Sequence, residues 1–208
     1  LGASGGIIFP FIKKFKNKFI LNFGGLDWKR SKWSFFTRKF LKFSEALAVK
    51  NSKFLISDNP GIYNYIKQQY KLDSHVIAYG GDQVSKIKPK KSDFRKYFFL
   101  NSTYVFSLAR IQSDNNIDMI LQTFVQLPSI NIVFVGNWQS SSYGLKTRKK
   151  YSNFKNIIML DAIYDQRELD LLRYNCNIYI HGHSAGGTNP ALVEAMNLCL
   201  PIFAFNSG

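Results

Sequence analysis

The stretch IYIHGHSAGGTNPALVEAMNLCLPIFAF, residues 178–205, has the pattern of a β-strand, a glycine-containing loop, a helix and a second strand. The runs 178–181 and 202–205 are rich in β-branched and aromatic residues, which favour strands. Between them, Pro190 opens a run with apolar residues at helical spacing, and proline is typical of the first position of a helix. This part of the chain therefore predicts strands that alternate with helices.

Strand-like and helix-like runs alternate along the rest of the chain as well. In the second half, further strands are expected at 104–108, 130–135 and 157–160. In the first half, strand candidates lie at 19–23, 54–57 and 76–79. Apolar strands separated by helices indicate a parallel sheet that is covered on both faces, with ligands at the carboxyl ends of the strands. We therefore predict an α/β fold with two Rossmann-like domains.

The composition of the chain changes between its two halves. Residues 80–101 are rich in Gly, Asp, Lys, Pro and Ser, and we place an interdomain linker at 83–101. Residues 1–82 are then expected to be the C-terminal part of one domain, and residues 102–208 most of the other. The chain opens without Met and stops shortly after the apolar run 201–205. We expect an internal fragment of a longer protein, in which both domains are incomplete.

The overall composition is that of a globular protein. Of 208 residues, 46% are hydrophobic and 16% are aromatic, which is enough to form a packed core. No apolar stretch approaches the roughly 18 residues needed to span a bilayer, and the sequence has no signal-peptide pattern. Cys176 and Cys199 are isolated, so they give no zinc or disulfide signal and fit a reducing compartment. A cytoplasmic location is expected.

Positive charge is concentrated in the first half of the chain. Residues 1–100 contain 20 Lys and Arg against 6 Asp and Glu, whereas residues 101–208 contain 8 against 7. This asymmetry indicates that the first half meets an anionic partner, either nucleic acid or a phospholipid surface. A lysine bias that only improves solubility is the alternative.

A helical pattern at 32–50 carries part of this charge. Its aromatic stripe consists of Trp33, Phe36, Phe40 and Phe43. The cationic residues beside the stripe are Lys32, Arg38, Lys39 and Lys42. Core packing would explain the stripe, but each nearby cation can add about 1 kcal/mol of attraction to an anionic bilayer. We favour a surface of this helix that faces the membrane.

The loop after the strand quoted first has the features of an anion site. Gly186 and Gly187 allow a ligand close to the backbone, and the amides at a helix N-terminus favour phosphate. Glu194 lies about one turn into the helix, where its carboxylate can face ribose hydroxyls. His181 and His183 flank the loop and are candidates for hydrogen bonds to a sugar or a phosphate oxygen. A tight turn with a surface glutamate and structural histidines is the alternative.

Asp27 is the available carboxylate in the first half that is expected to face a cleft. It lies in the loop GGLDWKR, which follows a predicted strand, and its carboxylate can bind the hydroxyl groups of an acceptor. A turn in which the Asp side chain bonds its own backbone is the alternative.

Five stretches of the sequence resemble one enzyme family. They are NFGGLDWKRSKWS (22–34), SDNPGIYNYI (57–66), VIAYGGD (76–82), LARIQSDNNIDMIL (108–121) and HGHSAGGTNPALVEAM (181–196). In their order and spacing they resemble glycosyltransferase family 4 of the GT-B fold, in particular the rhamnosyltransferase subgroup of polysaccharide biosynthesis. The resemblance covers nearly the whole chain. It implies two Rossmann-like domains that face each other across a cleft.

The resemblance also implies roles for individual residues. Glu194 resembles the second glutamate of the family's E-x7-E motif, which binds the ribose of the nucleotide. Thr188 and Asn189 resemble the loop whose backbone meets the diphosphate. Arg110 resembles the arginine that neutralises this diphosphate, and a permanently charged guanidinium suits that role. A surface ion pair is the alternative for Arg110.

Two positions depart from the family pattern. The first glutamate of the motif would be Gly186 here, and the lysine that usually lies five residues after the arginine is Asn115. The subgroup that this chain resembles uses the form GGTNP in place of these groups. The resemblance therefore implies a subgroup difference, and Asn115 stays among the candidates for donor binding.

The reaction that the resemblance implies is a retaining, metal-independent hexosyl transfer from a nucleoside-diphosphate sugar, dTDP-rhamnose, to a lipid-linked saccharide. No cofactor is expected, and the sequence shows no metal cluster. Arg110 and the amides at the helix end would stabilise the departing diphosphate, and Asp27 is the second candidate for catalysis. Such an enzyme is expected at the inner face of the plasma membrane. The alternatives are a sugar-nucleotide epimerase of the same fold and a basic protein that binds nucleic acid, for which no recognised motif is present.

Overall fold

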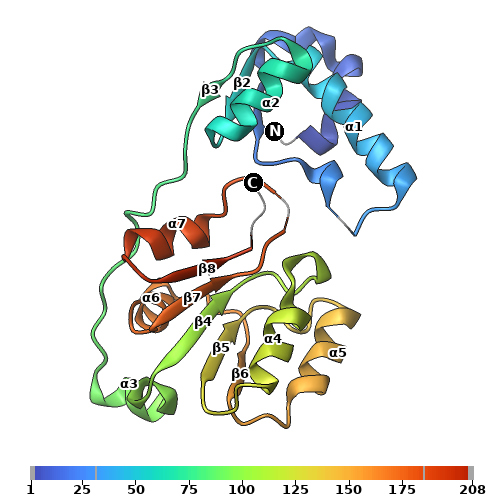
Figure 1. Ribbon diagram of the computed structural model, residues 1–208. Helices are drawn as coiled ribbons and strands as arrows, with labels where there is room; N and C mark the ends of the chain where they lie inside the picture. Colours follow the sequence, from blue (N-terminus) through green and yellow to red (C-terminus); the bar gives the residue numbers. More distant parts are fainter. Residues whose placement is uncertain (1–2, 31, 185, 206–208) are drawn as a thin grey trace. The chain divides into compact units, whose positions relative to one another are not determined.

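The computed structural model describes residues 3–30, 32–184 and 186–205. Within these ranges the chain divides into two compact units (Figure 1). The first unit contains residues up to 79 together with the short stretch 186–189, and the second contains residues 80–184 together with the stretch from 190 onward.

The first unit is built on a parallel sheet. Its described residues form three strands in the order β1 (Ile20–Phe23), β2 (Phe54–Ser57) and β3 (His75–Val76). The strand expected at 76–79 is shorter than predicted, because the chain leaves the sheet after the backbone N–H of Ile77 bonds the carbonyl of Ser57.

Helices connect the strands of the first unit, as parallel strands require. The helical elements are η1 (Ala3–Lys18), η2 (Asp27–Lys29), α1 (Phe35–Lys50) and α2 (Pro60–Tyr70). The helix predicted at 32–50 begins at Phe35, because the side chain of Ser34 accepts a hydrogen bond from the Thr37 amide and so caps the first turn. Asn59 caps α2 in the same way, and Pro60 occupies the first helical position.

The second unit carries a larger parallel sheet. Its described residues form five strands: β4 (Tyr104–Leu108), β5 (Asn131–Val135), β6 (Ile157–Leu160), β7 (Ile178–His181) and β8 (Ile202–Ala204). Their order in the sheet is β6-β5-β4-β7-β8. From β4 the chain continues through β5 to β6 at one edge, and from β7 it continues to β8 at the other edge. In a sheet of this kind the crevice at the carboxyl ends of the two central strands is the usual place for a ligand.

Helices cover both faces of the second sheet, as the apolar strands predicted. The helical elements are α3 (Lys91–Lys96), η3 (Phe98–Asn101), η4 (Ser113–Asn115), α4 (Ile117–Val125), α5 (Ser142–Tyr151), α6 (Gln166–Tyr174) and α7 (Pro190–Asn197). Helices α4 and α5 lie on one face, whereas α6 and α7 lie on the other (Figure 1). Alternate residues of each strand bury into opposite cores, so that Ile132 packs with α4 whereas Val133 packs with α6.

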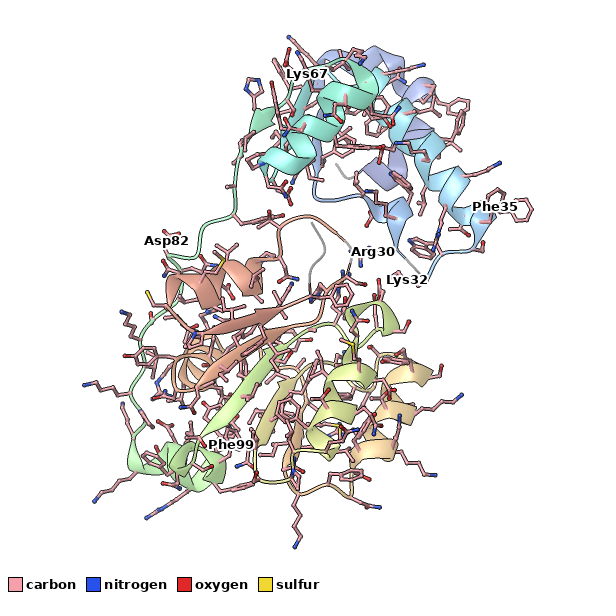
Figure 2. The ribbon with its side chains drawn as sticks, in the orientation of Figure 1. Arg30, Lys32, Phe35, Lys67, Asp82 and Phe99 are labelled. Carbon is pink, nitrogen blue, oxygen red and sulfur yellow. The ribbon has the colours of Figure 1, made fainter. Side chains whose placement is uncertain are left out.

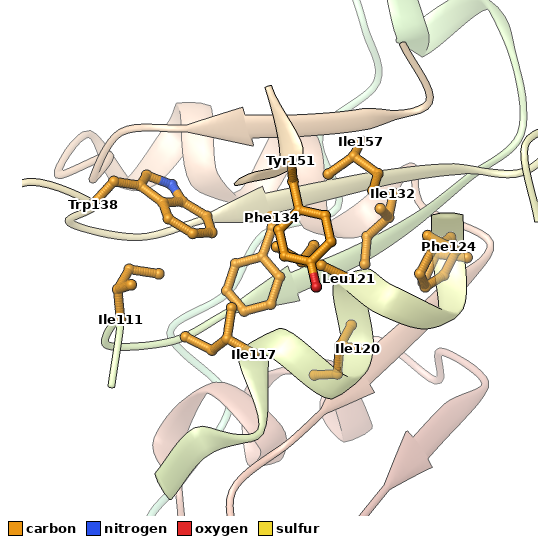
Figure 3. Close-up of a cluster of buried hydrophobic side chains, with 11 residues drawn as sticks. Ile111, Ile117, Ile120, Leu121, Phe124, Ile132, Phe134, Trp138, Tyr151 and Ile157 are labelled. Atoms are coloured by element: carbon orange, nitrogen blue, oxygen red, sulfur yellow. The ribbon is translucent and has the colours of Figure 1, made fainter. Parts of the chain in front are cut away.

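Figure 3 shows the core between the sheet and α4 and α5. Ile117 and Leu121 of α4 meet Phe134 of β5, and the rings of Phe134 and Trp138 are 5.5 Å apart in an edge-to-face arrangement. The indole N–H of Trp138 donates to the carbonyl of Leu160, which gives the ring's polar atom a partner inside the core. This packing fixes the sheet whose carboxyl edge carries the candidate site.

Candidate functional site

The candidate site lies at the carboxyl ends of the two central strands of the second unit, β4 and β7. Arg110 follows β4 by two residues and is exposed. Within the described ranges its guanidinium has no ion pair or hydrogen bond, which argues against the surface ion pair that was the alternative. A free, permanently charged guanidinium at this edge can take a phosphate group in a bidentate manner.

The loop that carries Arg110 is held from within by Asn115. The Asn115 side chain is 1% exposed, and its Nδ2 donates to the backbone carbonyl of Arg110 at 2.7 Å. Among the described residues its Oδ1 has no hydrogen-bond partner. Asn115 therefore fixes the conformation of the Arg110 backbone. Because Asn115 is buried, any effect of this residue on a ligand passes through the Arg110 loop and not through direct contact.

The loop after β7 is fastened to the loop after β4. Asn116 has a left-handed backbone (φ 53°), and its Nδ2 donates to the carbonyl of Gly182 at 2.8 Å. The hydroxyl of Ser184 donates to the carbonyl of Asp114 at 2.9 Å. A Cβ at Gly182 would lie 2.4 Å from the carbonyl oxygen of Asn115, so only glycine permits this close approach. The two loops form one continuous edge of the site.

The two histidines of the site stack on each other. The ring centroids of His181 and His183 are 4.4 Å apart, with an angle of 13° between the planes. His181 ends β7 and is buried, and this burial lowers its pKa to about 4. The imidazole of His181 is therefore neutral near pH 7. Its Nδ1 is buried and has no hydrogen-bond partner in the described part of the chain.

The stretch 186–189 belongs to the first unit and is held there by polar contacts. The amide of Thr188 donates to Oδ2 of Asp58 at 2.8 Å, and Nδ2 of Asn59 donates to the Thr188 hydroxyl at 3.1 Å. Burial raises the pKa of Asp58. Gly186 has φ of 136°, which favours glycine. The amide that was predicted to meet a diphosphate is thus bonded to a carboxylate oxygen in this structure.

Glu194 and Asp27 take up ion pairs with arginines. Oε2 of Glu194, on α7, lies 2.6 Å from Nη2 of Arg173, and its side chain is 14% exposed. Asp27 is exposed in η2 of the first unit, and its Oδ1 accepts a hydrogen bond from Nε of Arg30 at 3.2 Å. The Asp27 side chain is 53% exposed, so its carboxylate stays accessible to solvent and to hydroxyl groups, whereas Arg30 is 12% exposed.

The sequence interpretation missed two residues that the structure brings to Glu194. They are Arg173 and Gln83, which lie far from Glu194 along the chain. Gln83 falls in the predicted linker, and Arg173 lies on a helix with alternating charges, where an arginine is ordinarily exposed. No signal in the sequence distinguishes them from surface residues.

In the described part of the chain, no three His, Cys, Asp or Glu side chains gather as metal ligands. Among the helices described, none combines the length and the apolar character that a membrane-spanning segment needs.

Two family models match the sequence. Residues 2–82 match DUF1972, a domain of unknown function, and residues 89–208 match the family Glycosyl transferases group 1. Among curated protein sequences, none matches this chain.

Several solved structures are similar to this chain. Sucrose-phosphate synthase from Thermosynechococcus elongatus has a TM-score of 0.74 at 16% identity, with 98% of this chain and 54% of that chain covered. HepE from Anabaena, in complex with UDP-glucose, has a TM-score of 0.69 at 15% identity, with 91% and 53% covered. The pneumococcal O-GlcNAc transferase GtfA, in complex with UDP and GlcNAc, has a TM-score of 0.62 at 11% identity, with 98% and 40% covered.

These similarities concern the fold. The chain spans about half the length of the first two structures and less of the third. At such low identity they confirm the predicted α/β, GT-B architecture with parallel sheets. The match to the group 1 model covers more than half of the sequence, and it includes both loops of the candidate site. The chain therefore belongs to the family Glycosyl transferases group 1.

Proposed function

We propose that this chain is part of an enzyme that transfers rhamnose from a nucleoside-diphosphate sugar, dTDP-rhamnose, to a lipid-linked saccharide in cell-surface polysaccharide synthesis. The observation that carries the proposal is the site at the carboxyl ends of β4 and β7. There Arg110, which has no ion pair with any other described residue, lies beside the loop with the neutral His181. Two structures of the same fold hold UDP with a sugar, which supports a nucleotide sugar as the donor.

The proposed chemistry is electrostatic. As the bond between the sugar and the diphosphate breaks, negative charge grows on the leaving diphosphate, and the guanidinium of Arg110 stabilises it. The departing phosphate takes the proton of the acceptor hydroxyl, so no separate base and no metal or cofactor is required in this scheme. The sugar keeps its anomeric configuration. His181 and His183 offer hydrogen bonds to the sugar, and Asp27 offers its carboxylate to acceptor hydroxyls.

A transfer assay with the full-length protein tests this proposal. We expect label to move from dTDP-rhamnose to a lipid-linked saccharide, also in the presence of EDTA, and NMR of the product to show retention. UDP-glucose serves as the competing donor. Labelled sugar that changes configuration without any acceptor would favour the epimerase alternative. An absence of donor binding together with salt-dependent binding of RNA would favour the nucleic-acid alternative.

We further propose that the first unit docks on an anionic membrane at the cytoplasmic face. The side chains of Phe35, Phe36, Phe40 and Phe43 on α1 are all exposed, Phe36 at 80%. In Figure 2 the side chain of Phe35 points away from the ribbon of its unit. Among the described residues these exposures support a lipid-facing surface over core packing, which was the alternative for the aromatic stripe, although Trp33 of that stripe is only partly exposed. Exposed aromatic side chains beside cations are typical of a surface that binds lipid.

The cations beside this stripe are not equivalent. Nζ of Lys32 lies 5.0 Å from the ring of Trp33, and Nζ of Lys39 lies 4.5 Å from the ring of Phe35. Both lysines are exposed. Lys42 points inward, because its Nζ donates to the buried Glu45. Lys32 and Lys39 are therefore the charges to test.

Reversing Lys32 and Lys39 to glutamate should weaken sedimentation with vesicles of phosphatidylserine and phosphatidylcholine at least about tenfold, since each charge contributes about 1 kcal/mol. The matched control is the reversal of Lys86 and Lys88, which changes the net charge equally on an exposed part of the second unit. Binding of the unchanged protein should fall in 1 M salt, where the Debye length is about 3 Å. Equal effects of the two reversals, or equal binding to neutral vesicles, would contradict docking through α1.

A further inference from the structure

Arg173 places a fully buried guanidinium between two carboxylates. It lies in the last turn of α6 and is 0% exposed. Its Nη1 is 3.2 Å from Oδ1 of Asp170, and its Nη2 is 2.6 Å from Oε2 of Glu194. A buried charge is costly unless it is paired, so both contacts are needed to keep Arg173 where it is. The Glu194 carboxylate is thereby tied to the second unit's interior.

The other oxygen of Glu194 is tied to the segment that opens the second unit. Nε2 of Gln83 donates to Oε1 of Glu194 at 2.8 Å. This segment packs tightly on α7, since a Cβ at Gly81 would lie 2.8 Å from the carbonyl oxygen of Val193. The amide of Ser85 then donates to Oδ2 of Asp170 at 3.0 Å. Each oxygen of Glu194 is thus held by a group that is itself fixed.

Glu194 retains capacity for a ligand despite these contacts. A carboxylate offers about four acceptor positions; Gln83 donates a hydrogen bond to one of them, and Arg173 forms an ion pair with the other oxygen. The side chain of Glu194 is 14% exposed, so one side of it reaches solvent. A free glutamate side chain on a helix would sample several rotamers and would lose this freedom on binding. Holding it in advance removes that cost.

We propose that Arg173 and Gln83 are positioning residues that hold the Glu194 carboxylate in one orientation for the 3′-hydroxyl group of the donor's deoxyribose. The proposal deepens the proposed function and rests on it. Arg173 does not touch the ligand in this arrangement. Its effect passes through Glu194, and it should therefore appear in how strongly the protein distinguishes a ribose that carries the hydroxyl from one that lacks it.

The test compares dTDP with 2′,3′-dideoxythymidine diphosphate, which lacks the 3′-hydroxyl, by titration calorimetry on the full-length protein. The unchanged protein should prefer dTDP by about ten- to a hundredfold, because a hydrogen bond to a charged group is lost with the analogue. Glu194→Gln and the charge-balanced double variant Arg173→Met with Asp170→Asn should reduce this preference to about threefold or less. Arg173→Lys keeps the positive charge and should therefore retain part of the preference for dTDP.

Arg167→Met is the matched control, because Arg167 lies on the same helix but pairs with Asp93 at an exposed position. It should leave the preference unchanged. If the double variant does not fold, Gln83→Leu decides, since the Gln83 contact is exposed and its loss spares the core. Gln83→Leu should lower the preference several-fold.

The outcomes separate the inference from the function on which it rests. Variants that weaken both nucleotides equally, with the preference intact, would make Arg173 and Gln83 merely structural and overturn the inference. An unchanged protein that binds both nucleotides equally would also overturn it, while leaving nucleotide binding in place. An unchanged protein that binds neither dTDP nor UDP would overturn the proposed function together with the inference.

Discussion

Replacing Arg110 with alanine should weaken the binding of dTDP-rhamnose by at least about a hundredfold. Each hydrogen bond between charged groups contributes about 1.5–3 kcal/mol, and a bidentate contact with the diphosphate supplies two of them. Two features of the structure support a large effect. The guanidinium of Arg110 has no competing partner in the described ranges, and Asn115 fixes its backbone. Titration calorimetry of the full-length variant with the sugar nucleotide measures the change.

Two variants serve as controls for Arg110. Arg110→Lys keeps the charge but loses the planar fork of the guanidinium. Its affinity for the donor should therefore lie between that of the unchanged protein and that of Arg110→Ala. Arg148→Ala removes an arginine of the same unit that pairs with Asp161 at the surface, and affinity should stay as it was. If Arg110→Ala binds the donor as tightly as the unchanged protein does, Arg110 does not belong to the donor site.

Replacing Glu45 with alanine should lower the free energy of unfolding of the first unit by about 3–5 kcal/mol. Glu45 is 3% exposed, and its Oε1 accepts hydrogen bonds from the hydroxyls of Tyr65 and Tyr70, each at 2.5 Å, and from Nζ of Lys42 at 3.1 Å. Burial and the contact with Glu45 raise the pKa of both tyrosines, so their hydroxyls stay protonated and donate. Removing the Glu45 carboxylate takes this hydrogen-bond acceptor away from Tyr65, Tyr70 and Lys42 at once.

The chain offers a matched control for Glu45 in the same unit. Asp73 also accepts from a tyrosine and a lysine, namely Tyr63 at 3.1 Å and Lys67 at 2.7 Å, but its side chain is 70% exposed. Asp73→Ala should therefore lower the free energy of unfolding far less than Glu45→Ala does, because solvent screens an exposed pair. Urea unfolding, with hydrogen exchange of the α1 amides to locate the effect, compares the two variants. If both variants lose a similar free energy of unfolding, the burial of Glu45 does not determine how much it contributes to stability.

The prediction of the fold from the sequence followed from local patterns. The strands expected at 104–108, 157–160 and 178–181 appear with the same bounds, and Pro190 opens α7 as expected. These features depend on near neighbours along the chain. An apolar run indicates a strand that is buried on both faces, and a proline indicates the start of a helix. The alternation of such segments was therefore sufficient to predict the α/β class and the parallel sheets.

The candidate site could be predicted only as far as the ends of these elements. That Arg110 and His181 would lie at one edge follows from parallel strands, whose carboxyl ends point the same way. That the side chain of Asn115 would turn inward to bond the Arg110 carbonyl does not follow from any pattern. The exposure of Phe36 is likewise a tertiary result, because an aromatic stripe has the same spacing whether it is covered or free.

The sequence by itself determined the α/β class, most of the strands and the family to which the chain belongs, whereas the helices at 60–70 and 142–151 were found only in the structure. Only the tertiary structure decided that Arg173 is buried against Glu194, that Gln83 reaches the same carboxylate and that Glu45 collects two tyrosines and a lysine. The physical reason is the range of the interactions. Periodicity and caps act between residues a few positions apart, whereas a buried charge finds its partners wherever packing brings distant segments within about 3 Å.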